Sequence, residues 1–371
     1  MKQINKKKVL ICINTIEGII RFRQELVLKL IQNYRVIICA LEDKQDSRVI
    51  YLMRQGIEYE QVKMLTRGKN PFIELRTISA YREVIKKHHP DIVLCYTIKP
   101  NIYMTNIASR NKIPVITNVT GLGSGVLSDK FSNSITNMYC KALNKSTNIF
   151  FQNEENRKYL INHCQSLRNK AKLINGSGVN LDKFKYHNLE EKKSLVVTFV
   201  GRLMREKGIV EYYEAAKNIK KKYPNIEFYA IGELDEAVKE LIKTKEVAYL
   251  GKKEDIQPYI IKSDIIVNPS YHEGMSNVLQ EAAAIGRPLI ATNIPGCKEI
   301  VVDGYNGFLC KVKSSESLIN TLEKMIGLSY EQRKIMGQNS RQHVEENFNR
   351  KEIIEAYHSA IEIILGENIN E

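Results

Sequence analysis

Short apolar runs alternate with amphipathic helical patterns along the whole 371-residue chain, and this alternation constrains the fold more than any other feature. The helical patterns include residues 73–87, 210–222, 316–326 and 330–347. The strand-like runs are 8–14, 35–41, 57–63, 91–96, 115–119, 148–152, 171–174, 195–201, 227–231, 247–250, 264–268 and 288–292. Strands separated by helices form parallel sheets that helices cover on both faces. We therefore predict an α/β protein.

The chain is too long for one ordinary domain and long enough for two. A polar stretch at 185–193 separates two halves of similar organisation and is typical of a linker. We predict two doubly wound, Rossmann-like domains, residues 1–188 and 189–349, followed by a terminal segment, 350–371, with apolar residues at helical spacing. In such domains ligands bind at the carboxyl ends of the strands. Functional residues are therefore expected in segments that directly follow a strand.

Composition indicates a cytosolic protein with unevenly spread charge. No apolar run approaches the roughly 20 residues that span a bilayer. The seven cysteines include no C-x-x-C pair, which favours reduced thiols over disulfides or a zinc site.

The charge is unevenly spread along the chain. Residues 1–190 hold 31 Lys and Arg against 15 Asp and Glu, whereas residues 191–371 hold 25 Lys and Arg against 27 Asp and Glu. A basic first half attracts nucleic acid, anionic lipid or a phosphorylated substrate, although solvated lysines explain the same imbalance.

The segment 129–151 has two interpretations. Its apolar residues recur at helical spacing with three lysines nearby, so that a helix here could lie on an anionic membrane. The alternative is a helix that packs into the core of the first domain, and we favour this second interpretation.

The segment from Gly201 to Gly208 is the first candidate anion site. Gly201 ends a strand, Arg202 can bind a diphosphate through its forked guanidinium, and Lys207 adds a point charge. Together these cations would neutralise the charge that develops on a departing nucleoside diphosphate. Taken alone, the segment is equally compatible with a tight turn that carries solvated basic residues.

Glu273 and Glu281 form the second candidate. We expect a helix to begin near Gly274, so that its N–H groups lie beside Glu273 and favour an anion. Carboxylates accept paired hydrogen bonds from adjacent hydroxyls, so Glu281 would hold a ribose and Glu273 would face a sugar or its phosphate. The alternative is one Glu that stabilises the helix start and one exposed Glu. Arg202 and Lys207 also lie between a predicted strand and a predicted helix, and this shared position favours a sugar-nucleotide site.

In the first half, four residues that follow strands are candidates for contact with a phosphate. Arg23 is expected at the start of the helix after the first strand, and Lys99 follows the fourth strand. Gly121 and Gly123 belong to a G-x-G-x-G loop after the fifth strand, which does not match the dinucleotide fingerprint G-x-G-x-x-G. Solvated side chains and an ordinary loop are equally compatible with these residues. The sequence contains no D-x-D pair for a metal, and two cations take its place, so we predict no metal and no cofactor.

The second half resembles the family-4 retaining glycosyltransferases of the GT-B fold, closely over residues 195–310 and in outline elsewhere. The densest runs are FVGRLMREKGI, FYAIGELDE, YLGKKEDI and DIIVNPSYHEGMSNVLQEAAAIGRPLIATNIPGCKEIVVDGYNGFL. The resemblance implies that the two domains face a cleft and that residues 350–371 include a helix that crosses back to the first domain.

The same resemblance implies roles for individual residues. Arg202 and Lys207 would bind the donor diphosphate, and together with Glu273 they would be the catalytic residues. Glu281 would bind the ribose. Residues 274–277 would face the sugar through their backbone, and residues 250–253 would flank the base. The donor contacts implied in addition to Glu281 are Gly201, Leu250, Lys252, Gly274, Met275, Ser276 and Asn277.

The first half resembles the branch of the family that extends sugars on polyprenyl diphosphate carriers, including N-acetylgalactosaminyltransferases of bacterial protein glycosylation and capsule assembly. The resembling residues are Phe22-Arg23, Lys99-Pro-Asn101 and Gly121-Leu-Gly123. Two positions depart from the family pattern. Thr15-Ile-Glu-Gly18 replaces a Gly-Gly that many members carry, and the run 118–123 replaces a His.

These features predict a retaining, metal-independent glycosyltransferase. It would move a hexose or an N-acetylhexosamine of the GalNAc or GlcNAc type from a UDP-sugar to an undecaprenyl-diphosphate-linked saccharide, in bacterial capsule, O-antigen or glycan assembly. We expect it on the cytoplasmic face of the plasma membrane, held peripherally by anionic lipid. The alternatives are the same chemistry on a non-lipid acceptor, a nucleic-acid-binding protein, which lacks a recognisable reading motif, and an inactive scaffold, disfavoured because both acids and both cations are present.

Overall fold

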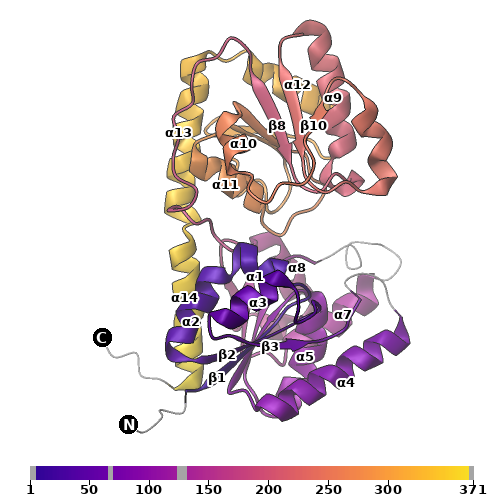
Figure 1. Ribbon diagram of the computed structural model, residues 1–371, viewed down its shortest axis with the longest axis vertical. Helices are drawn as coiled ribbons and strands as arrows, with labels where there is room; N and C mark the ends of the chain where they lie inside the picture. Colours follow the sequence, from indigo (N-terminus) through magenta and orange to yellow (C-terminus); the bar gives the residue numbers. More distant parts are fainter. Residues whose placement is uncertain (1–5, 66–69, 123–131, 367–371) are drawn as a thin grey trace. The chain divides into compact units, whose positions relative to one another are not determined.

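Two parallel sheets divide the chain into two units. The computed structural model describes residues 6–65, 70–122 and 132–366. Unit 1 contains the chain up to Ser177 and again from Glu352, and unit 2 contains Gly178–Lys351 (Figure 1).

The polar stretch 185–193, interpreted from the sequence as the linker, lies wholly within unit 2. There the His187 N–H donates to the Ile285 carbonyl, and the Tyr330 hydroxyl donates to the Leu189 carbonyl.

Unit 1 is built on a seven-stranded parallel sheet with the strand order β3-β2-β1-β4-β5-β6-β7. The strands are β1 (Lys8–Cys12), β2 (Arg35–Ala40), β3 (Glu58–Gln61), β4 (Ile92–Tyr96), β5 (Val115–Val119), β6 (Asn148–Phe151) and β7 (Ala171–Leu173). The helices are α1 (Glu17–Phe22), α2 (Gln24–Asn33), α3 (Ser47–Arg54), α4 (Pro71–His88), α5 (Ile98–Arg110), α7 (Ser132–Leu143), α8 (Glu154–His163) and the 3-10 helix η1 (Gln165–Leu167). The order reverses direction between β1 and β4, which defines the switch point where ligands bind in such sheets.

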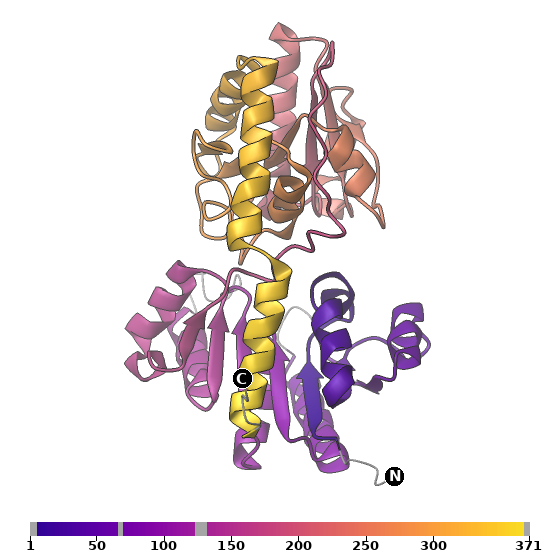
Figure 2. The same cartoon turned by 90° about the vertical axis from the view of Figure 1, so that its left-hand side faces the viewer.

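The last helix, α14 (Arg350–Leu365), carries the chain from unit 2 into unit 1. Its residues Tyr357 and Ile361 are buried among side chains of the unit 1 strands, and Figure 2 shows the helix along one face of that sheet. The Asn118 amide at the end of β5 donates a hydrogen bond to the Tyr357 hydroxyl. The apolar spacing at 350–365 therefore reflects a helix that completes the core of unit 1.

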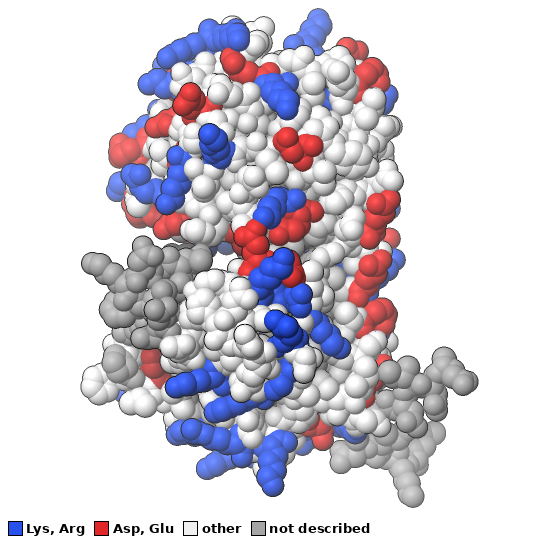
Figure 3. Space-filling model, turned by 180° about the vertical axis from the view of Figure 1, so that it is seen from behind, with Lys and Arg blue, Asp and Glu red and all other residues white. Residues whose placement is uncertain are grey.

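The surface and the core of unit 1 bear on two expectations. On the face drawn in Figure 3, Lys and Arg side chains gather over unit 1, in the lower part of the picture, in keeping with the charge of the first half.

Helix α7, within the segment 129–151, packs into the core through Tyr139 and Leu143. The core-facing interpretation of this segment is therefore the correct one. Within the described residues, no helix combines the length and the apolar character that crossing a membrane requires.

Unit 2 is built on a six-stranded parallel sheet with the order β10-β9-β8-β11-β12-β13. The strands are β8 (Val196–Val200), β9 (Glu227–Ile231), β10 (Ala248–Tyr249), β11 (Ile265–Asn268), β12 (Leu289–Thr292) and β13 (Gly307–Cys310). The helices are η2 (Arg205–Lys207), α9 (Ile209–Lys222), η3 (Glu236–Lys243), α10 (Gln257–Lys262), α11 (Asn277–Ile285), α12 (Ser315–Ile326) and α13 (Tyr330–Asn347). Helices α9 and α12 bury one core against the sheet, and α10 and α11 bury another.

The hydrophobic periodicity predicts most of these elements. Each of the twelve predicted strands is present, and the bounds of β5 and β9 match the predicted ranges. Strand β13 was not predicted; it begins with Gly307, and glycine is depleted in strands.

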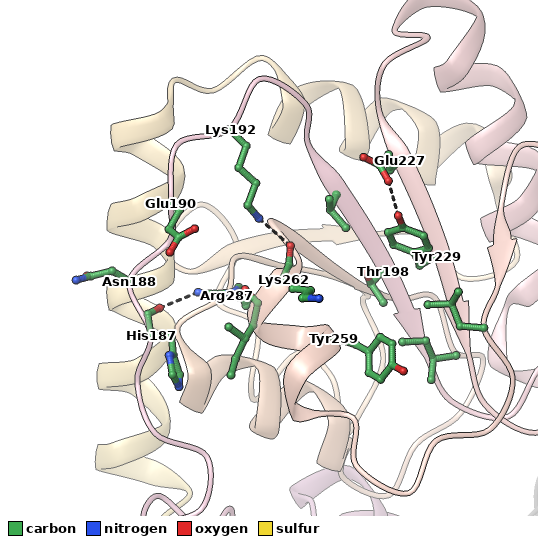
Figure 4. A pocket seen from close by; sticks show the side chains of 14 residues that line it. His187, Asn188, Glu190, Lys192, Thr198, Glu227, Tyr229, Tyr259, Lys262 and Arg287 are labelled. Atoms are coloured by element: carbon green, nitrogen blue, oxygen red, sulfur yellow. Dashed lines mark hydrogen bonds between the residues drawn. The ribbon is translucent and has the colours of Figure 1, made fainter.

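A buried arginine holds unit 2 together beneath helix α10. The Arg287 side chain is 1% exposed, and its guanidinium donates to the carbonyls of His187, Ile260 and Ile261 at 2.8, 3.1 and 2.7 Å (Figure 4). Burial lowers the pKa of Arg287 to about 10, so the group is still charged at neutral pH. Breaking a buried, fully bonded charge leaves its carbonyl partners unsatisfied.

We therefore expect Arg287→Met to destabilise the protein by about 3 kcal/mol and to lower Tm by about 10 °C. Thermal unfolding followed by circular dichroism measures this change. The control is Lys262→Met, an exposed residue at the end of α10, which should change stability by less than about 0.5 kcal/mol. Equal stability of the two variants would show that the carbonyls find other partners.

Candidate active site

Two loops of unit 2 follow neighbouring strands at the switch point of the sheet. Strand β8 lies between β9 and β11, and the strand order reverses between β8 and β11. The first loop, residues 201–208, follows β8, and the second, residues 269–276, follows β11. In an open parallel sheet this position is where ligands bind.

A lysine and a glutamate from these two loops form an ion pair. The Lys207 Nζ lies 2.6 Å from the Glu273 Oε1, and the two side chains are 26% and 14% exposed. The buried Ser270 hydroxyl lies 2.8 Å from the same carboxylate oxygen and 2.6 Å from the Asn268 Oδ1. Because a hydroxyl carries one hydrogen, the two acceptors share it. The carboxylate is therefore held between a cation and a buried hydroxyl.

Close backbone packing ties the two loops together. Gly208 has a φ of 72°, and a Cβ there would lie 2.0 Å from the Pro269 carbonyl oxygen, so only glycine fits. The Tyr271 N–H donates to the Glu206 carbonyl at 2.9 Å, and the Tyr271 hydroxyl donates to Glu211 at 2.6 Å. Burial and this bond raise the pKa of Tyr271, so its hydroxyl keeps its proton. These contacts fix the loop of Lys207 against the loop of Glu273.

Helix α11 begins at Asn277, so the expectation of a helix start near Gly274 was wrong by three residues. Ser276 caps the helix through its hydroxyl, and its N–H donates to the Gly296 carbonyl at 2.8 Å. Gly296, with a φ of 83°, lies so close that a Cβ would be 2.7 Å from the Gly274 carbonyl oxygen. The loop after β12 thus holds residues 274–276 outside the helix, and Glu273 lies beside Lys207 instead of in the first helical turn.

The other predicted donor residues lie in segments that follow β8, β10 and β11. Glu281 is half-buried in the second turn of α11, and Asn277 is the first residue of that helix. Met275 is 5% exposed and packs into the core, so only its backbone is available to a ligand. The remaining positions are Gly201 and Gly274, both partly exposed, Leu250, half-buried after β10, and Lys252, exposed two residues later. Arg202 is exposed and forms no ion pair with a described residue.

In unit 1, Arg23 does not begin a helix as expected but lies between α1 and α2, where the backbone leaves the helical region with a φ of −135°. Its side chain is 6% exposed, and the guanidinium lies 5.0 Å from the centre of the Tyr96 ring. Tyr96 is the last residue of β4. The structure therefore places Arg23 at the carboxyl end of β4, but buried rather than solvated.

The other candidates of unit 1 follow β4 and β5. Lys99, in the first turn of α5, forms an ion pair with Glu74 of α4, and both side chains are largely buried. Thr97 precedes this helix with a φ of 71°, and such strained residues concentrate at functional sites. Gly121 is partly buried after β5, and Gly123 lies outside the described residues. Arg23, Thr97 and Lys99 therefore all lie at or just after the carboxyl end of β4.

A pocket of about 760 Å³ lies elsewhere on unit 2, between α10, the segment 187–192 and strands β8 and β9 (Figure 4). Of the predicted donor residues only Leu250 lines it. Two of its cations are bonded to the protein, since Lys192 donates to the Lys262 carbonyl and Arg287 donates to four carbonyls. The pocket therefore does not define the charged site. In the described part of the chain, no group of three Asp, Glu, His or Cys side chains is arranged to hold a metal ion.

Two residues of the site, Ser270 and Tyr271, were not identified from the sequence. The pattern Ser270-x-x-Glu273, a serine followed three residues later by an acid, was the available signal. It is easily overlooked, because it usually marks a helix start and no helix begins there. The contact between Tyr271 and Glu211 joins residues 60 positions apart, so no local pattern reveals it.

Replacement of Ser270 tests whether its hydroxyl orients Glu273. We expect Ser270→Ala to lower kcat about tenfold with little change in KM, because the carboxylate loses one of the two groups that orient it. Steady-state kinetics measures both values. The control is Ser263→Ala, which removes another buried hydroxyl bonded within unit 2, at 2.6 Å from Thr198, and should reduce stability without lowering kcat. A kcat loss of equal size in both variants would show that Ser270 acts only through stability.

Comparison with known proteins identifies both halves of the chain. Residues 181–343 match the family described as glycosyl transferases group 1, and residues 9–153 match the family described as glycosyl transferase 4-like. The chain is similar to N,N'-diacetylbacillosaminyl-diphospho-undecaprenol alpha-1,3-N-acetylgalactosaminyltransferase of Campylobacter jejuni, with 28% identity over 323 residues, which cover 78% of this chain and 84% of that protein.

A second relative and a solved structure agree with these matches. The UDP-Gal:alpha-D-GlcNAc-diphosphoundecaprenol alpha-1,3-galactosyltransferase of Escherichia coli is 28% identical over 311 residues, which cover 78% of this chain and 79% of the relative. The structure of Anabaena HepE in complex with UDP and glucose has a TM-score of 0.76 at 17% identity, covering 96% of this chain and 99% of that one. The chain is therefore a glycosyltransferase of the family-4 type, with the GT-B fold.

Proposed function

We propose that this enzyme transfers a hexose or an N-acetylhexosamine from a UDP-sugar to an undecaprenyl-diphosphate-linked saccharide, with retention and without a metal ion. The observation that carries the proposal is the ion pair of Lys207 and Glu273 at the switch point of unit 2, since it places a cation and a carboxylate together where a ligand binds. The product would serve bacterial capsule, O-antigen or glycan assembly.

The donor would lie along the carboxyl ends of β8, β10 and β11. Lys207 and Arg202 would contact the diphosphate, Glu281 the ribose, and residues 250–253 the base. Glu273 and the backbone of residues 274–277 would face the sugar. The names of the two relatives support this class of reaction, because one of them includes UDP-Gal as donor, and HepE was solved with UDP.

The transfer would exchange one bond at the anomeric carbon. The bond from that carbon to the diphosphate oxygen breaks, and a bond to the acceptor oxygen forms on the same face. The acceptor proton passes to the departing phosphate, and Lys207 and Arg202 stabilise the charge that develops there. Both relatives form an alpha linkage by name, and an alpha product from an alpha-linked UDP-sugar requires retention.

The acceptor would lie at the carboxyl end of β4 in unit 1. Arg23 and Lys99, beside the strained Thr97, are the groups there that suit a lipid diphosphate. Both relatives act, by name, on a saccharide joined to undecaprenol through a diphosphate. Such an acceptor requires the enzyme to work at a membrane surface, which supports a peripheral position on the cytoplasmic face.

Thermal shift with a panel of UDP- and GDP-sugars tests the donor assignment. We expect one UDP-sugar to raise Tm equally in Mg²⁺ and in EDTA, because two cations replace the metal, and we expect Glu281→Ala to lose the shift. Stabilisation only in the presence of Mg²⁺ would contradict metal independence. A shift with GDP-sugars alone, or with no nucleotide at all, would contradict the donor class.

A further inference from the structure

Helix α4 of unit 1 exposes two large apolar side chains in its first two turns. Phe72 is 78% exposed and Leu75 is 64% exposed. The opposite face of the helix is the buried one, since Tyr81, Val84 and Ile85 pack into the core of unit 1. Single exposed apolar residues are ordinary on protein surfaces, so the neighbours of this pair decide what it means.

The same face of α4 is strongly basic. Its exposed positions follow one another at intervals of three and four residues and therefore form one stripe along the helix. This α4 face consists of Phe72, Leu75, Arg76, Ser79, Arg82, Glu83, Lys86 and Lys87. Lys87 pairs with Glu60, whereas Arg76, Arg82 and Lys86 form no ion pair with a described residue. A helix with exposed apolar residues and several cations is typical of binding to an anionic lipid surface.

The α4 face lies near the carboxyl end of β4, where the proposed function places the acceptor. Glu74, between Phe72 and Leu75 in the chain, points to the protein and pairs with Lys99 at the start of α5. Lys99 follows the carboxyl end of β4. The apolar pair therefore lies next to the segment where the proposed function places a lipid diphosphate, a group that sits at the level of membrane headgroups.

We propose that the α4 face docks onto an anionic lipid surface, with Phe72 and Leu75 in the interface and Arg76, Arg82 and Lys86 at the headgroups. Charge complementarity with the lipid supports this occupant over a second copy of the chain, because two copies of the same basic face repel each other. The biological purpose of docking rests on the proposed function, since a lipid-linked acceptor requires it. The binding itself is measured without any sugar.

Flotation of the full chain with vesicles tests the proposal. We expect binding to vesicles of phosphatidylglycerol and phosphatidylcholine, weakened by salt, and weaker binding to phosphatidylcholine alone. The double variant Phe72→Ser, Leu75→Ser should lower vesicle affinity by at least about tenfold. The triple variant Arg76→Gln, Arg82→Gln, Lys86→Gln should lower it by a similar factor and remove most of the salt dependence.

The matched control is Ile335→Ser, Ile363→Ser, which removes two other apolar side chains that are 52% and 58% exposed, on α13 and α14. Its vesicle affinity should stay within about twofold of the unchanged protein. All variants should keep the same Tm and the same stabilisation by UDP. The proposal is overturned if the Phe72 and Leu75 variant floats like the unchanged protein, if phosphatidylglycerol has no effect, or if that variant instead dissociates a dimer.

The donor-site variant Glu281→Ala separates this proposal from the proposed function. We expect it to bind vesicles normally. If no UDP-sugar binds while the vesicle results hold, the donor assignment fails and the docking face stands. If UDP-sugars bind and transfer proceeds while vesicle binding does not depend on the α4 face, the docking face fails and the enzyme function stands.

Discussion

Lys207→Met is expected to lower kcat by about 100- to 1,000-fold, because the proposed function assigns this lysine to the charge that develops on the departing diphosphate. The Lys207 Nζ lies at the switch point of unit 2, held by Glu273 at 2.6 Å, so it is already oriented before a ligand arrives. The affinity for UDP should fall less than kcat, because charge on the leaving diphosphate grows during the reaction. Single-turnover kinetics at saturating donor measures the chemical step directly.

The control for this prediction is Arg205→Met, which removes an exposed cation from the same short helix η2. It should keep kcat within about twofold, because surface substitutions seldom disturb a structure. If Lys207→Met keeps kcat within tenfold of the unchanged enzyme, the lysine serves only to hold the loop. In that case Glu273→Gln, which removes the same ion pair, should give an equal and small effect.

Glu281→Ala is expected to weaken UDP binding by about 10- to 100-fold, because the proposed function assigns to this carboxylate the hydrogen bonds to the ribose hydroxyls. The side chain is half-buried in the second turn of α11, near the carboxyl edge of the sheet. Comparison of UDP with 2'-deoxy-UDP by calorimetry isolates the contact. The unchanged enzyme should prefer UDP, and the variant should bind both nucleotides equally.

Glu331→Ala is the control for Glu281→Ala, since Glu331 is an exposed acid in the first turn of another helix of unit 2. It should bind UDP normally and keep the preference for the ribose hydroxyl. A Glu281→Ala enzyme that still prefers UDP over the deoxy analogue would assign the ribose to a different residue.

Sequence periodicity predicts the sheets of this protein well because parallel strands buried on both faces form continuous apolar runs. The bounds of β5 and β9 match the predicted ranges for that reason, whereas helices such as α13 were predicted from apolar residues at helical spacing. The charged residues at strand ends were also predictable, because in a doubly wound sheet the chemistry follows the strands. Lys207 and Glu273 were both candidates on these grounds.

Contacts between distant residues could not be predicted in the same way. Arginine is seldom buried, and the position of Arg23 depends on Tyr96, which lies 73 residues away in the chain. The start of α11 was misplaced because Gly296, on the loop after β12, holds residues 274–276 outside the helix. In each case the deciding partner comes from another strand end and leaves no local pattern.

Transfer of labelled sugar from a panel of UDP-sugars to an undecaprenyl-diphosphate-linked N-acetylhexosamine, in detergent with EDTA, tests the central proposal most directly. We predict that one UDP-sugar labels the lipid in EDTA and that NMR of the product shows an alpha linkage. Transfer only with added metal, a beta linkage, or no transfer to the lipid from any UDP-sugar would contradict the proposal.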